Sequence, residues 1–65
     1  MQIDLNGTPF TVGASSLADA LTELGYSGHA LATALNGKFV PAAARPVTAL
    51  RDGDRVEVLA PMQGG

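Results

Sequence analysis

The fold is decided first by residues 1–12, which read MQIDLNGTPFTV. Apolar and polar residues alternate on both sides of Asn6-Gly7, a pair that supplies the two positive-φ residues of a two-residue type I′ hairpin. Such a loop places Ile3 opposite Phe10. We therefore expect two antiparallel strands whose apolar side chains share one face.

Pro9 predicts where this hairpin lies in its sheet. In the predicted register Pro9 is opposite Asp4, and Met1 is opposite Val12. At this position a backbone N–H would point away from the first strand, toward a possible third strand. Proline has no N–H to donate there, so no further strand is expected on that side. The second strand should therefore be an edge, and the first should lie inside the sheet.

A short amphipathic helix is predicted to follow. Its apolar residues recur at i, i+3, i+4 and i+7, namely Leu17, Ala20, Leu21 and Leu24. Ser16, with Asp19 three residues later, forms a variant of the capping box, and Gly25 supplies the left-handed residue that ends a helix. We expect Asp19 and Glu23 on the solvent side of this helix.

A second Asn-Gly pair, Asn36-Gly37, predicts a shorter hairpin between residues 30–35 and 38–41. The following stretch, residues 42–50, is rich in alanine but contains Pro46. Because proline is excluded from a helix interior, we expect a loop or one short turn of helix there.

The last strand is predicted at residues 55–59, after a turn at Asp52-Gly53-Asp54, with Val56 and Val58 facing inward. The element order is then ββαβββ, and the last strand is most economically inserted beside the first. This order predicts an α+β protein of the β-grasp (ubiquitin-like) fold, with a mixed sheet and one main helix. The rival, a ferredoxin-like split βαβ, needs a second helix that Pro46 disfavours.

The composition limits what the chain can do. Its 65 residues make one small domain, expected to bury only about 60% of the surface that its unfolded chain exposes. It has no cysteine, a net charge of −2, no basic cluster and no apolar stretch of membrane-spanning length. We therefore expect a cytoplasmic protein, monomeric when free, that binds neither nucleic acid nor membrane.

Few residues suggest catalysis, so no resident cofactor or metal site is predicted. His29 is the single histidine and lacks metal-ligand spacing, which favours an exposed loop residue. Asp52 is interpreted as a turn residue. Three charged residues lie on or near the last strand, namely Asp54, Arg55 and Glu57. We interpret them as a solvent-exposed strand face, and the alternative is that they contact a partner protein.

The most distinctive group is the carboxylate of Gly65, which follows Pro61, Met62, Gln63 and Gly64. Two glycines without Cβ fit a channel too narrow for side chains. We expect residues 1–59 to form the β-grasp domain and residues 60–65 a flexible tail that extends about 20 Å into a partner. Pro61, Met62, Gln63 and Gly64 are the predicted partner-binding residues; a frayed end is the alternative.

The segments MQIDLNG (1–7), LNGKFVP (35–41) and DGDRVEVLAPMQGG (52–65) resemble the ThiS family, the ubiquitin-like sulfur carriers of thiamin biosynthesis. These matches span nearly the whole chain. One departure is the alanine-rich stretch 42–46, where a more polar loop is expected.

The resemblance implies a carrier that is a cosubstrate rather than an enzyme. A ThiF-like activating enzyme, holding ATP and magnesium, would adenylate the carboxylate of Gly65. Sulfur from a persulfide, such as that of a cysteine desulfurase, would then give a thiocarboxylate, and thiazole synthase would receive the sulfur. Two alternatives stay open, namely a molybdopterin-type sulfur carrier and a ubiquitin-like modifier or interaction module.

Overall fold

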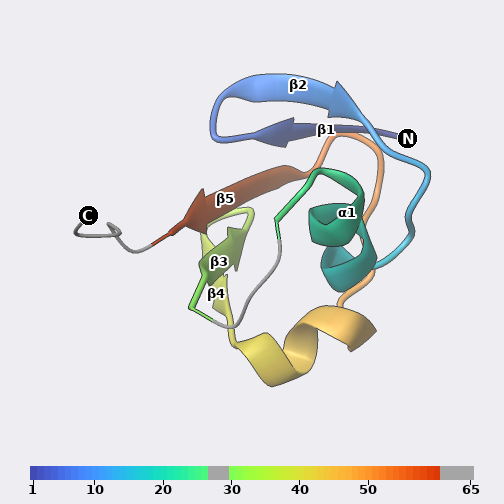
Figure 1. Ribbon diagram of the computed structural model, residues 1–65. Helices are drawn as coiled ribbons and strands as arrows, with labels where there is room; N and C mark the ends of the chain where they lie inside the picture. Colours follow the sequence, from blue (N-terminus) through green and yellow to red (C-terminus); the bar gives the residue numbers. More distant parts are fainter. Residues whose placement is uncertain (27–29, 61–65) are drawn as a thin grey trace.

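The structure is a computed structural model that describes residues 1–26 and 30–60. Its elements in chain order are β1 (Gln2–Leu5), β2 (Thr8–Thr11), α1 (Leu17–Glu23), β3 (Ala32–Leu35), β4 (Lys38–Val40), the 3-10 helix η1 (Ala42–Val47) and β5 (Arg55–Leu59). The strands form one sheet in the order β2-β1-β5-β3-β4. Figure 1 shows that β5 ends on the side of the molecule away from the N-terminus.

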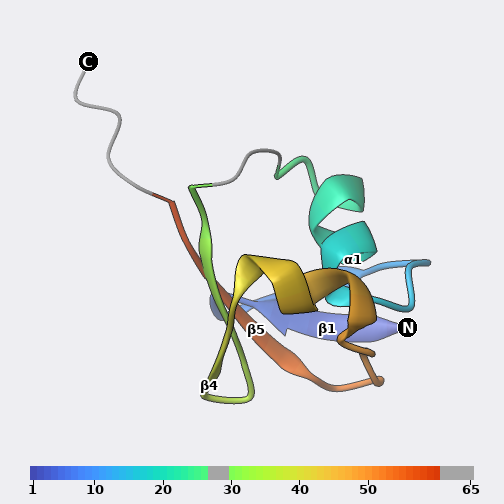
Figure 2. The same cartoon turned by 90° about the horizontal axis from the view of Figure 1, so that it is seen from below.

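The sheet is mixed, as predicted. β5 lies between the two hairpins, parallel to β1 and antiparallel to β3. The helices α1 and η1 pack against each other, and Figure 2 shows them on the same side of the sheet. One α-helix covering one face of a sheet made of two hairpins and a parallel central strand is the β-grasp arrangement, and the split βαβ alternative is wrong.

The first hairpin has the predicted register. Ile3 pairs with Phe10, and Asp4 pairs with Pro9 at the outer edge strand. Asn6 and Gly7 have φ values of 51° and 88°, as a type I′ turn requires. Phe10 lies opposite Ile3, so the two share a face as predicted, and Phe10 is 38% exposed at the edge strand.

Helix α1 begins and ends where the sequence predicts. The Ser16 hydroxyl accepts a hydrogen bond from the Asp19 N–H at 3.2 Å, and Gly25 follows the helix with φ 91°. Glu23 is exposed, as expected, but its carboxylate also accepts hydrogen bonds from the Gly13 and Ala14 N–H groups at 3.0 and 3.1 Å. The helix therefore also fixes the connection that leads into it.

Residues 42–47 correct the expectation of a loop or a single turn. They form a six-residue 3-10 helix with Pro46 as its fifth residue. A short 3-10 helix makes few internal hydrogen bonds, so the N–H that Pro46 lacks costs little there. Thr48 closes the helix because its N–H donates to the Arg45 carbonyl at 3.3 Å and its hydroxyl to the Ala44 carbonyl at 2.7 Å.

The core lies between the sheet and the two helices. Its buried apolar residues are Ile3, Leu5, Val12, Leu17, Ala20, Leu21, Val40, Leu50, Val56 and Val58. Arg45 is buried beside them at 8% exposure. Its Nε donates to the Thr33 hydroxyl at 3.0 Å and its Nη2 to the Leu31 carbonyl, which ties η1 to β3. No sequence pattern predicted this buried guanidinium.

Candidate partner-binding face and C-terminal segment

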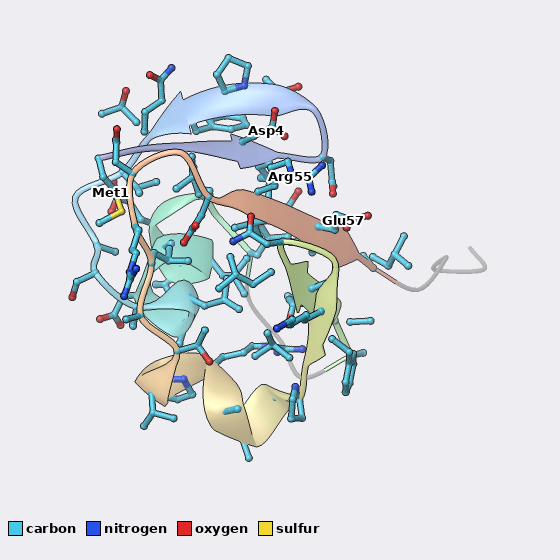
Figure 3. All side chains as sticks on the ribbon, turned by 180° about the vertical axis from the view of Figure 1, so that it is seen from behind. Met1, Asp4, Arg55 and Glu57 are labelled. Atoms are coloured by element: carbon cyan, nitrogen blue, oxygen red, sulfur yellow. The ribbon has the colours of Figure 1, made fainter. Side chains whose placement is uncertain are left out.

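The outer face of the sheet is the face that no helix covers. Strand alternation places Arg55, Glu57 and Leu59 on it, since Val56 and Val58 face the core. Asp4 of β1 pairs with Arg55 in the parallel ladder. Figure 3 shows Asp4 on β1 and Arg55 and Glu57 along β5, with Glu57 nearer the end of the strand.

Two of the hollows on the described surface lie along β5 on this face, and Asn6 and Glu57 line both of them. The larger hollow, of about 510 Å³, also has the charged side chains of Asp4 and Arg55 in its wall, together with Gly7 and Val56. The smaller, of about 200 Å³, is bounded by Ala32, Ala34, Phe39 and Leu59. Polar and apolar surfaces therefore meet along β5.

The smaller hollow carries two exposed large apolar side chains. Phe39 is 71% exposed and Leu59 is 74% exposed. They come from β4 and β5, on either side of β3, where Ala34 pairs with both Phe39 and Glu57. Because alanine is small, the side chains of Phe39 and Leu59 stand at the rim of a depression. Exposed apolar side chains gathered around a depression are typical of a protein-binding surface.

Of the three outward residues considered for partner contact, Asp54 has another role. Its Oδ1 accepts a hydrogen bond from Asn36 Nδ2 at 3.0 Å and its Oδ2 from the Arg51 N–H at 2.8 Å. Asp52, interpreted as a turn residue, accepts from the Gln2 N–H at 2.6 Å. Both carboxylates therefore stabilise the connection into β5, and Arg55 and Glu57 remain as partner-contact candidates.

The last described residues lie at the edge of this apolar depression. Leu59 pairs with Ala32 of β3, and Ala60 follows it exposed. The predicted site residues 61–65 lie outside the described residues, as does His29; of the predicted tail, residues 60–65, only Ala60 is described. What the structure gives is the position from which the C-terminal segment leaves the sheet.

Asn6, which sequence reasoning assigned only to its turn, has a second function in the structure. Its side chain bonds to the backbone of Val58 in β5. Asn36, in the second Asn-Gly turn, accepts a hydrogen bond from the Arg55 N–H at 2.9 Å. The presence of Asn rather than Gly at both turns was the sequence signal for these side-chain hydrogen bonds. It did not identify β5 as the strand to which the two side chains bond.

The part of the chain that the structure describes contains no helix long and apolar enough to span a membrane. Across residues 1–26 and 30–60, no group of three or more His, Asp or Glu side chains is placed to hold a metal ion. The candidate site is the outer face of the sheet, which carries the exposed side chains of Phe39 and Leu59, together with the C-terminal residues that follow Leu59 in the sequence.

The sheet order and the covering helix define a ubiquitin-like β-grasp protein. The sequence model of the ThiS family matches residues 3–65. The sulfur carrier protein ThiS of Thermus thermophilus is 41% identical over 61 residues, which cover 94% of this chain and 95% of that protein. The chain therefore belongs to the ThiS family.

Solved structures agree with this assignment. The crystal structure of the thiamine biosynthesis protein ThiS from Geobacter metallireducens matches with a TM-score of 0.81 and 35% identity, covering 100% of both chains. The solution structure of a thiamine biosynthesis protein from the same organism matches with a TM-score of 0.81 and 32% identity, covering 100% of this chain and 88% of that one. These identities place the similarity above the level of a shared fold alone.

Proposed function

We propose that this protein is a sulfur carrier for the thiazole of thiamin, and that its reactive group is the carboxylate of Gly65. The observation that carries the proposal is the match to the ThiS family, which extends to residue 65. The β-grasp body supports it, because β5 delivers Ala60 to the rim of an exposed face. Six residues from there extend about 20 Å, enough to enter a partner's active site.

The chemistry explains why such a carrier needs an activating partner. A carboxylate is a poor electrophile, because attack on it would have to expel oxide. Reaction with ATP forms an acyl-adenylate and releases pyrophosphate, so that AMP becomes the leaving group. The terminal sulfur of a persulfide then attacks the acyl carbon and displaces AMP, which gives an acyl disulfide. A thiol attacks the donor's sulfur in that acyl disulfide, forms a disulfide with it and releases the thiocarboxylate.

The carrier is thus a protein substrate, and ATP and magnesium belong to a ThiF-like activating enzyme. We assign thiazole synthase as the sulfur acceptor and a cysteine-desulfurase persulfide as the donor. The outer face would contact these proteins through Phe39 and Leu59, with Arg55 and Glu57 beside them. Pro61, Met62, Gln63 and Gly64 would occupy the partner's channel, where glycine permits a close backbone approach.

The direct test is an intact mass after incubation with the activating enzyme, ATP and a sulfur donor. We expect one oxygen to be replaced by one sulfur. A variant lacking Gly65 should fold equally well, as judged by thermal unfolding, and gain no sulfur. A wild-type chain that gains no sulfur in a system competent for a known carrier would refute the proposal. Transfer to thiazole synthase, but not to molybdopterin synthase, distinguishes the thiamin role.

Gly64→Ala tests the channel. A methyl group at the penultimate position should clash or displace the carboxylate, and a displacement of about 1 Å costs ~100-fold in rate. Pyrophosphate exchange by the activating enzyme should fall by about that factor, while the unfolding temperature stays unchanged. His29→Ala is the matched control and should alter neither measurement. Equal exchange rates for wild type and Gly64→Ala would show that this glycine is incidental.

A further inference from the structure

β5 extends beyond the strand that pairs with it on one side. The parallel ladder between β1 and β5 pairs Leu5 with Val56. The Asn6 N–H donates to the Val56 carbonyl at 3.0 Å, and the chain then turns away. From there on, among residues 1–26 and 30–60, no strand pairs with β5 on the β1 side, although β5 continues to Leu59.

The side chain of Asn6 continues the ladder by one step. Its Oδ1 accepts a hydrogen bond from the Val58 N–H at 2.9 Å, and its Nδ2 donates to the Val58 carbonyl at 3.1 Å. A carboxamide has the same donor and acceptor as a peptide unit, so it replaces the missing strand residue. Val58 is thereby held by Asn6 on one side, while Thr33 lies opposite it in β3 on the other.

The turn alone does not explain this residue. A type I′ turn accepts Asn, Asp or Gly at its first central position. Asp carries two acceptor oxygens and would face the Val58 carbonyl with like charge, and Gly offers no side chain. Among these residues, Asn alone satisfies both backbone groups of Val58.

We propose that Asn6 is a positioning residue that fixes where and in which direction the chain leaves the sheet. The bond to Val58 lies two residues before Ala60, on the side of β5 that has lost its strand neighbour. It keeps the last residues of β5 in the plane of the sheet, beside the depression that Asn6 itself lines. We call the two hydrogen bonds between the Asn6 side chain and Val58 the Asn6 clamp. The clamp does not depend on the proposed function, whereas its consequence for sulfur transfer does.

The second Asn-Gly turn provides a matched control. Asn36 has φ 50°, against 51° for Asn6, and it too bonds to β5. Its contacts are with the Arg55 N–H and the Asp54 carboxylate, at the beginning of the strand. Asn6→Gly and Asn36→Gly thus remove equivalent side chains from equivalent turns, and both retain a residue that accepts positive φ.

Amide hydrogen exchange and ¹⁵N relaxation of the full chain test the clamp. In Asn6→Gly, the protection of the Val58 amide should fall by about 10-fold beyond any global change, as expected for a local opening. Order parameters of Leu59 and Ala60 should fall with it. Asn36→Gly should instead weaken protection at Arg55. Asn6→Asp should keep part of the Val58 protection, because one acceptor remains. Equal Val58 protection in the two glycine variants would overturn the proposal.

Pyrophosphate exchange with the activating enzyme tests the functional consequence. Asn6→Gly should lower kcat by about 10-fold, because the last residues of β5 would no longer hold one position and the carboxylate of Gly65 would be misplaced. Its KM should change less than its kcat, since Phe39 and Leu59, the exposed apolar side chains of the outer face, are unchanged, and Asn36→Gly should leave kcat within about twofold of wild type. Equal kcat values for the two variants would overturn the positioning role. A wild-type chain that is not adenylated would refute the proposed function, while hydrogen exchange still decides the clamp.

Discussion

The two faces of the sheet are built from the same strands but serve opposite purposes. Along β5, Val56 and Val58 are buried at 1% and 5% exposure, whereas the intervening Glu57 is exposed and Leu59 is 74% exposed. Burial of apolar area stabilises the fold, so the inner face determines stability. The outer face keeps apolar side chains in water, where they contribute to stability little but are available to a partner. Alternation thus separates, within one strand, the side chains that stabilise the fold from those that are exposed and available to a partner.

The largest effect should come from removing a side chain on the inner face. Val56→Ala should lower the free energy of unfolding by roughly 2–3 kcal/mol, because two buried methyl groups are lost and a cavity is left. Val47→Ala makes the same change at an 84% exposed position and should stay within about 0.5 kcal/mol. Urea denaturation measures both. Similar losses would contradict the conclusion that burial on the inner face determines stability.

A smaller loss is expected at Arg45, the buried cation of the helical side. Arg45→Lys cannot donate to both Thr33 and Leu31 with the geometry of a guanidinium, and should cost about 1–3 kcal/mol. Arg51→Lys, at an exposed position, is the control and should be neutral. The unfolding midpoints of the two variants are compared with that of wild type. An unchanged midpoint in Arg45→Lys would mean that the hydrogen bonds of the Arg45 guanidinium do not contribute to stability.

On the outer face the effect should move from stability to binding. Phe39→Ala should leave the free energy of unfolding within about 1 kcal/mol, since this ring is 71% exposed. Its KM with the activating enzyme should rise by about 10-fold, as for an apolar anchor at an interface. Val47→Ala, exposed but distant from the hollow, should leave KM unchanged. A KM unaffected by Phe39→Ala would exclude this depression from the interface.

The smallest effect is expected from the charge between the two hollows. Glu57→Gln should change the association rate with the activating enzyme by only about two- to fivefold, and the difference should shrink as salt is added, because rim charges act mainly on encounter. Stopped-flow association at two ionic strengths measures it. A salt-independent change would indicate that Glu57 makes a buried contact instead.

Sequence alone determined the strands and the α-helix of this protein, though not the 3-10 helix at residues 42–47, and the family to which it belongs. The Asn-Gly pairs required positive φ, the spacing of Leu17 and Leu21 required a helix, and Pro9 required an edge strand. Each of these signals acts over a few residues, so it is readable without knowledge of the fold. The likeness of its motifs to the ThiS family gave the proposed chemistry at Gly65.

The element order predicted that β5 lies beside β1, as it does, but only the tertiary structure decided which side chains meet. Insertion of β5 beside β1 brings Asn6 to Val58, which are 52 positions apart in the chain. Packing of η1 buries Arg45 against Thr33, and the sheet gathers Phe39 and Leu59 around one depression. No local preference encodes such contacts, because they depend on which strands become neighbours when the whole apolar face is buried at once.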